Sequence, residues 1–400
     1  MQNAAARPGD WLRPALLIVC GVTALRVALM AFNRTDLFVD EAQYWFWGQE
    51  LAFGYYSKPP MIGWVIRAAT ELAGSDAPFW VRLPAPLFHA VSALLLATIA
   101  APRWGREAAI WVAALYITLP MVTVGSYMIS TDTIMFPFLI LSLLAWLACL
   151  DRGGHLVWAA VAGAALGLAF LSKYAAIYYL ICAPLAAVLL WQGRTTWAAA
   201  GVALAAFAVA ISPNVIWNLV NGLTTLEHTL DNADWVRDPG DRAELNFVGL
   251  AEFLGSQFAV FGPVLFAALL WLYARRGAGD PMRALVLIFS FPILAIVCVQ
   301  ATLSGAYANW AAATYIGGLL AVVPWLLTKP RGWMVGSLVL HGAFAVLIPV
   351  ATAFGTGWTH GPEDRLMLAR YLGRSEMSAA ILDLARAEGL DVVADDRDIL

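Results

Sequence analysis

Charged residues are scarce in this chain, and their scarcity excludes an ordinary soluble protein. Lys, Arg, Asp and Glu supply only 13% of the 400 residues, whereas hydrophobic residues supply 61%, and the mean hydropathy is +0.73. Soluble domains carry about twice that share of charge. The composition therefore predicts a membrane protein.

Cysteine pairs and glycine-rich phosphate loops are also missing. The four cysteines lie in apolar runs without a CxxC spacing, so we expect small core residues and neither disulfides nor zinc ligands: Cys20, Cys149, Cys182 and Cys298. None of the glycines forms a phosphate-cradling motif. We therefore expect no nucleotide cofactor and no nucleic-acid partner.

Apolar runs long enough to cross a bilayer recur along most of the chain. They predict an all-α polytopic protein of about eleven transmembrane helices, near residues 13–32, 81–101, 108–126, 133–149, 156–171, 174–191, 197–217, 249–273, 284–303, 308–327 and 332–354. The first run has full length and no small-residue cleavage site, so we expect it to remain as an anchor. The short "SKY" break at residues 172–174 predicts a broken or re-entrant turn.

The basic residues predict the orientation. If the N-terminus is cytoplasmic, the short loops on that side carry most of the arginines, as the positive-inside rule requires. Most of the acids then fall in the outer loops, two of which are long, at about residues 33–80 and 218–248. In the first of them, "DEAQYWFWGQELAFG", ending at Gly54, and "MIGWVIRAATELAG" predict two amphipathic helices at the membrane interface.

The chain divides into a transmembrane domain, residues 1–355, and a polar tail, residues 356–400. In the tail, "EDRLMLARYLG" and "EMSAAILDLARAEG" predict surface helices and "LDVVAD" predicts a strand. We expect a small α/β segment outside the membrane, without an evident last element.

The first outer loop contains the strongest candidates for chemistry. Asp40 and Glu41 follow the first span, where a carboxylate can act as a general base; the alternative is an acid pair solvated at the interface. Lys58, in "YYSKPP", is rigidly presented before Pro59 and suits a phosphate; the alternative is a lysine that snorkels toward head groups.

Weaker candidates lie at the outer ends of other spans. Asp132, in "STDT", is either a site residue or a helix N-cap, and Lys173, in "LSKY", is either a second phosphate ligand or a snorkelling lysine. Arg26, inside the first span, is expected to pair with an acid of the first loop. The weaker substrate-binding candidates are Tyr44, Tyr55, Tyr56, Arg82, Asp132, His228, Asn309 and Trp310.

The second long loop, "LEHTLDNADW", offers possible ligands for a divalent metal. Its Glu227, His228, Asp231 and Asp234 match no zinc spacing, and solvated loop acids are the alternative reading. No metal site is therefore assigned.

The segments "DEAQYW", "GYYSKPP", "STD" and "LSKY" resemble the GT-C glycosyltransferases, in particular the protein mannosyltransferase-like group that includes the lipid A aminoarabinose transferases. The resemblance implies a GT-C bundle in the inner membrane, with the active site and the tail periplasmic. It implies transfer of a sugar from polyprenyl phosphate to a lipid, glycan or protein acceptor, with inversion. Asp40 and Glu41 would be catalytic, and Lys58 and Lys173 would bind the donor phosphate. The chain departs from the aminoarabinose transferases at Gln43, where they often have arginine.

Two other classes of function compete with this one. Many helices with buried charges are also typical of a transporter or flippase, although the polar residues here concentrate on one side and no inverted repeat is visible. A non-catalytic lipid-binding or scaffold protein would not need an acid pair opposed by a lysine.

Overall fold

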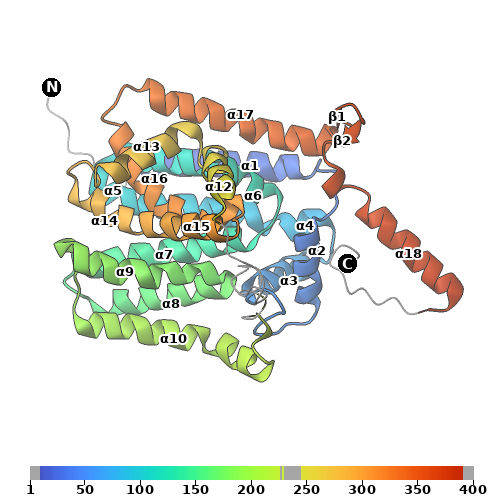
Figure 1. Cartoon of the computed structure of the whole chain (residues 1–400), viewed down its shortest axis with the longest axis horizontal. Helices are drawn as coiled ribbons and strands as arrows, with labels where there is room; N and C mark the ends of the chain where they lie inside the picture. Colours follow the sequence, from blue (N-terminus) through green and yellow to red (C-terminus); the bar gives the residue numbers. More distant parts are fainter. Residues whose placement is uncertain (1–9, 226–227, 229–244, 391–400) are drawn as a thin grey trace.

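The computed structural model describes residues 10–225, 228 and 245–390. Most of them are helical, and most of the long helices run side by side (Figure 1). The helices of the bundle are α1 Leu12–Met30, α5 Pro84–Thr118, α6 Pro120–Tyr127, α7 Thr131–Asp151, α8 Leu156–Ser172, α9 Tyr178–Leu189, α10 Trp197–Val220, α12 Phe247–Val260, α13 Pro263–Ala274, α14 Pro281–Ile288, α15 Phe291–Leu303, α16 Thr314–Leu326 and α17 Gly332–Phe354.

Every predicted span coincides with one or more helices, but the count of eleven transmembrane helices is not confirmed. Six helices of the described chain are long and apolar enough to cross a membrane, or seven with one bent pair. The bent pair is α12 and α13, which meet at 119°. Gly262, at φ 89°, and Pro263, at the first position of α13, separate them.

Short helices fill the segment between α1 and α5 and gather at one end of the long helices (Figure 1). They are α2 Val39–Gln49, α3 Met61–Ala73 and α4 Pro78–Arg82. The two predicted amphipathic helices are thus confirmed, except that α2 ends before Gly54. α3 ends where Gly74 adopts φ 63°, a conformation that glycine reaches without strain.

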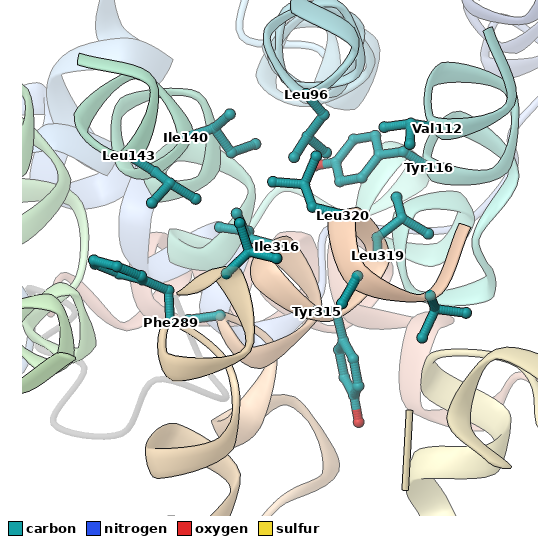
Figure 2. Close-up of a cluster of buried hydrophobic side chains, with 14 of the residues drawn as sticks. Leu96, Val112, Tyr116, Ile140, Leu143, Phe289, Tyr315, Ile316, Leu319 and Leu320 are labelled. Atoms are coloured by element: carbon teal, nitrogen blue, oxygen red, sulfur yellow. The ribbon is translucent and has the colours of Figure 1, made fainter. Parts of the chain in front are cut away.

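The core is centred on α16 (Figure 2). Every residue of this helix except Trp325 is buried, as expected for a helix that is apolar all round. Ile316, Leu319 and Leu320 lie among side chains of α5 and α7, including Leu96, Tyr116, Ile140 and Leu143. The helices α5, α13, α14 and α15 all pack against α16 and cover it.

The helices α8 and α10 pack closely through small residues. Gly163 and Gly167 are spaced four apart on α8, and a side chain at Gly163 would overlap the backbone of Ala203 on α10. This small-residue spacing is typical of helices that associate in membranes.

The tail is partly as predicted. α18, Arg374–Glu388, confirms the second surface helix and extends away from the bundle (Figure 1). The first predicted helix, "EDRLMLARYLG", is wrong: it contains strand β2, Arg365–Leu366, and the 3-10 helix η4, Ala369–Tyr371. β2 pairs antiparallel with β1, Thr359–His360, and this pairing satisfies backbone groups that a helix would have used. The predicted strand at "LDVVAD" lies outside the described residues, apart from Leu390.

Candidate active site

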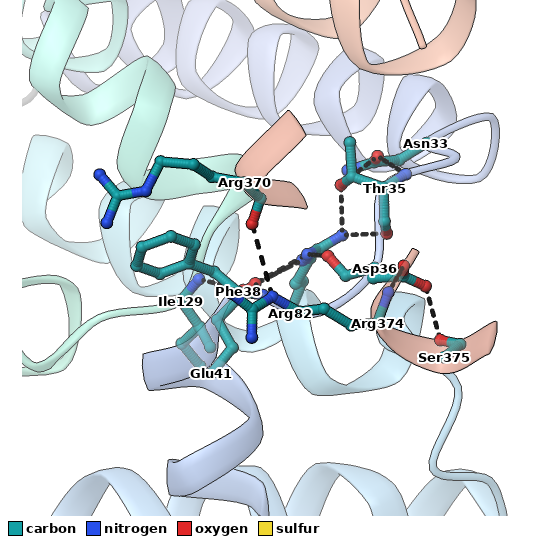
Figure 3. A network of polar contacts seen from close by, with 10 residues as sticks. All are labelled: Asn33, Thr35, Asp36, Phe38, Glu41, Arg82, Ile129, Arg370, Arg374 and Ser375. Carbon is teal, nitrogen blue, oxygen red and sulfur yellow. Dashed lines mark hydrogen bonds and ion pairs between the residues drawn. The ribbon is translucent and has the colours of Figure 1, made fainter. Parts of the chain in front are cut away.

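A buried ion pair fixes the start of α2. The Glu41 carboxylate is fully buried and lies 2.7 Å from Arg82 Nη2, while Arg82 Nε donates to it at 3.0 Å (Figure 3). The backbone N–H groups of Ile129, at 2.9 Å, and Phe38, at 3.0 Å, also donate to Glu41. Glu41 therefore joins α2 to α4 and to the loop that precedes α7.

Arg82 uses all three of its nitrogen atoms inside the protein. Besides Glu41, it donates to Thr35, through Nη1 at 3.2 Å, and to the carbonyl of Asp36, through Nη2 at 2.6 Å. Its side chain is only 2% exposed. A buried, fully hydrogen-bonded pair is suited to holding a backbone in place, and we assign Glu41 and Arg82 this positioning role.

Asp40 lies beside Glu41 but in a different environment. Consecutive helical residues point in directions about 100° apart, so burial of Glu41 turns Asp40 away from the ion pair. Asp40 is partly exposed, in the first turn of α2, where the helix dipole stabilises a carboxylate. Of the predicted acid pair, Asp40 is therefore the carboxylate that is partly exposed.

Three other candidates meet at the same end of the bundle. Lys173 Nζ lies 2.7 Å from both carboxylate oxygens of Asp132, and Asn309 Nδ2 donates to Asp132 Oδ2 at 3.0 Å. The N-cap of α7 is Ser130, which accepts from the Thr133 N–H, so the N-cap alternative for Asp132 is wrong. Lys173 thus has a carboxylate partner, whichever of its two predicted roles applies.

The loop between α2 and α3 is held against α10. Asn214 Nδ2 donates to the carbonyl of Phe53 at 2.7 Å, and Tyr174 Oη donates to Asn214 Oδ1 at 3.1 Å. Gly54 lies so close to the ring of Trp217 that any side chain there would overlap it. Because Tyr174 follows Lys173 in sequence, these contacts bring the "GYYSKPP" and "LSKY" segments together.

Tyr55 shapes the turn that carries Lys58. Its ring stacks on Trp47 at 5.1 Å, its hydroxyl donates to the Glu50 carbonyl at 3.2 Å, and its N–H donates to the Lys58 carbonyl at 3.1 Å. Burial raises the pKa of Tyr55, so the hydroxyl stays protonated and remains a donor. The backbone of Lys58 is thus fixed while its side chain is partly exposed.

The remaining candidates make mainly aromatic and apolar contacts. Tyr44 is buried in the small core under α2 and α3. Tyr56 is exposed and its ring lies 4.9 Å from that of His228, and Trp310 packs against Tyr307. The metal-ligand candidates Glu227, Asp231 and Asp234 fall outside the described residues. Within the described residues, no group of three His, Cys, Asp or Glu side chains could hold a metal ion.

Arg26 has a different partner from the one expected. It donates to the hydroxyls of Thr123, at 2.8 Å, and Ser126, at 3.1 Å, on α6. The prediction of an acidic partner from the first loop is therefore wrong. Sequence analysis also missed Asn214, although an amide inside an apolar span was a usable signal.

Known proteins resemble this chain in sequence. A sequence model of the family Dolichyl-phosphate-mannose-protein mannosyltransferase matches residues 57–217. The lipid A galacturonosyltransferase RgtD of Rhizobium johnstonii is 42% identical over 393 residues, which are 97% of this chain and 81% of that protein.

Solved structures share the fold. ArnT from Cupriavidus metallidurans bound to undecaprenyl phosphate matches with a TM-score of 0.59 and 15% identity, over 95% of this chain and 70% of that chain. The Archaeoglobus fulgidus oligosaccharyltransferase matches with a TM-score of 0.54 and 13% identity, over 98% of this chain and 61% of that chain. At these identities, the likeness concerns the fold alone.

The similarity to RgtD distinguishes between the three predicted classes of function, which are glycosyltransferase, transporter and scaffold. Identity of 42% along nearly the whole chain makes this protein a member of the relative's family, and neither the transporter nor the scaffold reading is favoured. The apolar helices agree with a multi-pass membrane protein. The chain belongs to the GT-C glycosyltransferases, the polytopic membrane enzymes that transfer sugars.

Proposed function

We propose that this enzyme transfers a uronic-acid sugar from a polyprenyl-phosphate donor to a lipid A acceptor. The observation that carries the proposal is the meeting of four segments at one end of the bundle: the start of α2, the Lys58 loop, the start of α7 and the turn after α8. A 42% identical relative named lipid A galacturonosyltransferase supports the sugar and the acceptor. Undecaprenyl phosphate bound to a protein of the same fold supports the donor.

Asp40 is the proposed general base. It would take the proton from the acceptor hydroxyl as that oxygen forms its bond to the anomeric carbon of the sugar. The bond from this carbon to the phosphate oxygen breaks on the opposite side, so that the configuration inverts. Asp40 suits this role better than Glu41, since Asp40 is partly exposed whereas Glu41 is fully buried.

Lys58 is the proposed ligand of the donor phosphate. As the sugar leaves, negative charge grows on the phosphate, and a partly exposed ammonium on a fixed backbone would stabilise it. Lys173 is the weaker candidate for the same phosphate, and its ammonium contacts the carboxylate of Asp132. Asp132, Lys173 and Asn309 would then have a structural role. Their contacts would hold the start of α7, the turn after α8 and the segment before α16 together beside the phosphate.

The orientation belongs to the same proposal. Arginines concentrate in the short loops at the end of the bundle opposite Asp40, and the positive-inside rule would place that end in the cytoplasm. The active site and the tail would then face the periplasm, in the inner membrane. Labelling of single cysteines in the α2–α3 loop of intact cells by a membrane-impermeant reagent tests this orientation; protection of that loop would reverse it.

The direct test of Asp40 is its replacement by asparagine. Membranes containing Asp40→Asn are incubated with polyprenyl-phosphate galacturonic acid and lipid A, and the product is measured. General-base catalysis typically contributes about a hundredfold to ten-thousandfold, so the rate should fall by at least a hundredfold. The matched control is Glu50→Gln, which alters an exposed acid at the other end of α2 and should keep the full rate. A wild-type rate for Asp40→Asn would remove this residue from the mechanism.

A further inference from the structure

A cavity opens where α1 and α17 end side by side, apart from Asp40 and Lys58. It has a volume of about 250 Å³ and is lined by Ala31, Phe32, Asn33, Arg34, Ala353 and Phe354. A water molecule takes up about 30 Å³, so the cavity can hold a phosphate-sized group together with water. The backbone is fixed there, because the Arg34 N–H donates to the Thr352 carbonyl at 3.1 Å.

Asn33, which lines the cavity, has a buried donor without an acceptor among the described residues. Asn33 Oδ1 accepts from the N–H and the hydroxyl of Thr35, at 2.9 and 2.8 Å, which orients the amide (Figure 3). Asn33 Nδ2 is buried and has no hydrogen-bond partner in the described chain. A buried donor left without an acceptor costs about 1–3 kcal/mol, so this group favours a ligand that brings an acceptor oxygen.

Next to this donor lies a cation. Arg34 is exposed, and within the described residues no carboxylate pairs with its guanidinium. Arginine binds phosphate oxygens with two parallel N–H donors, and its charge shortens and strengthens these bonds. A ligand with acceptor oxygens could therefore accept hydrogen bonds from a neutral donor, the amide of Asn33, and from a charged donor, the guanidinium of Arg34.

The rim of the cavity carries exposed aromatic side chains. Phe32 is 63% exposed and follows the end of α1, and Phe354 is 67% exposed and is the last residue of α17. Both helices are long and apolar enough to span a membrane. Aromatic side chains at this depth contact the upper parts of acyl chains, whereas arginine lies at the level of the head groups. A ligand with an anionic head and apolar tails satisfies both parts of the cavity.

We propose that Asn33 and Arg34 bind the phosphate group of a membrane lipid in this cavity, with the lipid tails against Phe32 and Phe354. The site is separate from the proposed transfer reaction and does not depend on it. Thr35 nevertheless connects the two regions, because it bonds both Asn33 and Arg82.

Binding of three probes to the purified full-length protein in detergent tests the proposal. The probes are short-chain phosphatidic acid, the matching neutral diacylglycerol and inorganic phosphate, and the readout is the dissociation constant. Wild type should bind phosphatidic acid at least tenfold more tightly than either other probe. Arg34→Gln removes a charge-assisted hydrogen bond and should weaken binding by about tenfold.

Two further variants separate binding from folding. Asn33→Asp keeps the acceptor for Thr35 but replaces the free donor with a negative charge, so it should also weaken binding by at least tenfold. Arg13→Gln removes an exposed arginine at the other end of α1 and should leave binding unchanged. Unchanged binding in both Arg34→Gln and Asn33→Asp would overturn the site, and equally tight binding of inorganic phosphate would overturn its assignment to a lipid.

Discussion

Replacement of Arg82 by methionine should destabilise the protein strongly, because it leaves a buried carboxylate without its cation. Arg82 is 2% exposed and Glu41 is 0% exposed, and their closest atoms lie 2.7 Å apart. Removal of one partner of such a pair typically costs about 3–5 kcal/mol. The N–H groups of Ile129 and Phe38 would still donate to Glu41, so we expect a loss of about 3–4 kcal/mol in the free energy of unfolding.

The measurement is denaturant unfolding in detergent micelles, followed by the loss of helical structure, for Arg82→Met, Glu41→Gln and the double variant. In Glu41→Gln the buried side chain no longer carries a charge that needs Arg82. The double variant should therefore lose at least about 1 kcal/mol less free energy of unfolding than the two single variants lose together. Strictly additive effects, or a loss below about 1 kcal/mol for Arg82→Met, would refute the idea that this pair holds the start of α2.

Three further changes test the other contacts of the site. Gly54→Ala would push a methyl group into the ring of Trp217 and shift the Lys58 loop, so the transfer rate should fall about tenfold to a hundredfold. Lys173→Met leaves the partly buried Asp132 without its cation and should lower the free energy of unfolding by about 1–3 kcal/mol in denaturant titration. Asp36→Ala removes the acceptor of the Arg374 N–H at 2.9 Å, so trypsin should cut the tail of the native protein roughly tenfold faster.

Each of these changes has a matched control. Gly21→Ala adds a methyl group where nothing lies within 4 Å and should keep the transfer rate. Lys329→Met, on an exposed lysine, should change stability by less than about 1 kcal/mol, and Asp383→Asn, on an exposed face of α18, should leave tryptic cleavage unchanged. A variant that behaves like its control would contradict the role assigned to the corresponding contact.

The local features of the fold could be predicted from the sequence. Apolar length located the six long apolar helices of the described chain, and the amphipathic pattern located α2 and α3, because both signals depend on neighbouring residues only. The number of spans could not be predicted in this way. Prolines and glycines divide several apolar runs, as at Gly262 and Pro263, and only packing decides whether the two halves continue in line.

The sequence identified residues of the candidate site one by one, but it did not show which of them contact each other. Asp40 and Glu41 look equivalent in sequence, and the position of Arg82 decides which of them is buried. Asp132 and Lys173 were each identified separately, yet their contact requires the start of α7 to meet the end of α8. Such pairs join residues about forty positions apart, which spacing along one helix cannot reveal.

The central claim, transfer of a uronic-acid sugar from polyprenyl phosphate to lipid A, is tested most directly by mass spectrometry of a defined reaction. Purified protein is reconstituted into vesicles with polyprenyl-phosphate galacturonic acid and lipid A, and both lipids are measured over time. We expect lipid A to gain one galacturonic acid residue as an equal amount of polyprenyl phosphate is released. Lipid A of unchanged mass, together with movement of the intact sugar lipid across the vesicle membrane, would contradict the proposal and indicate a flippase.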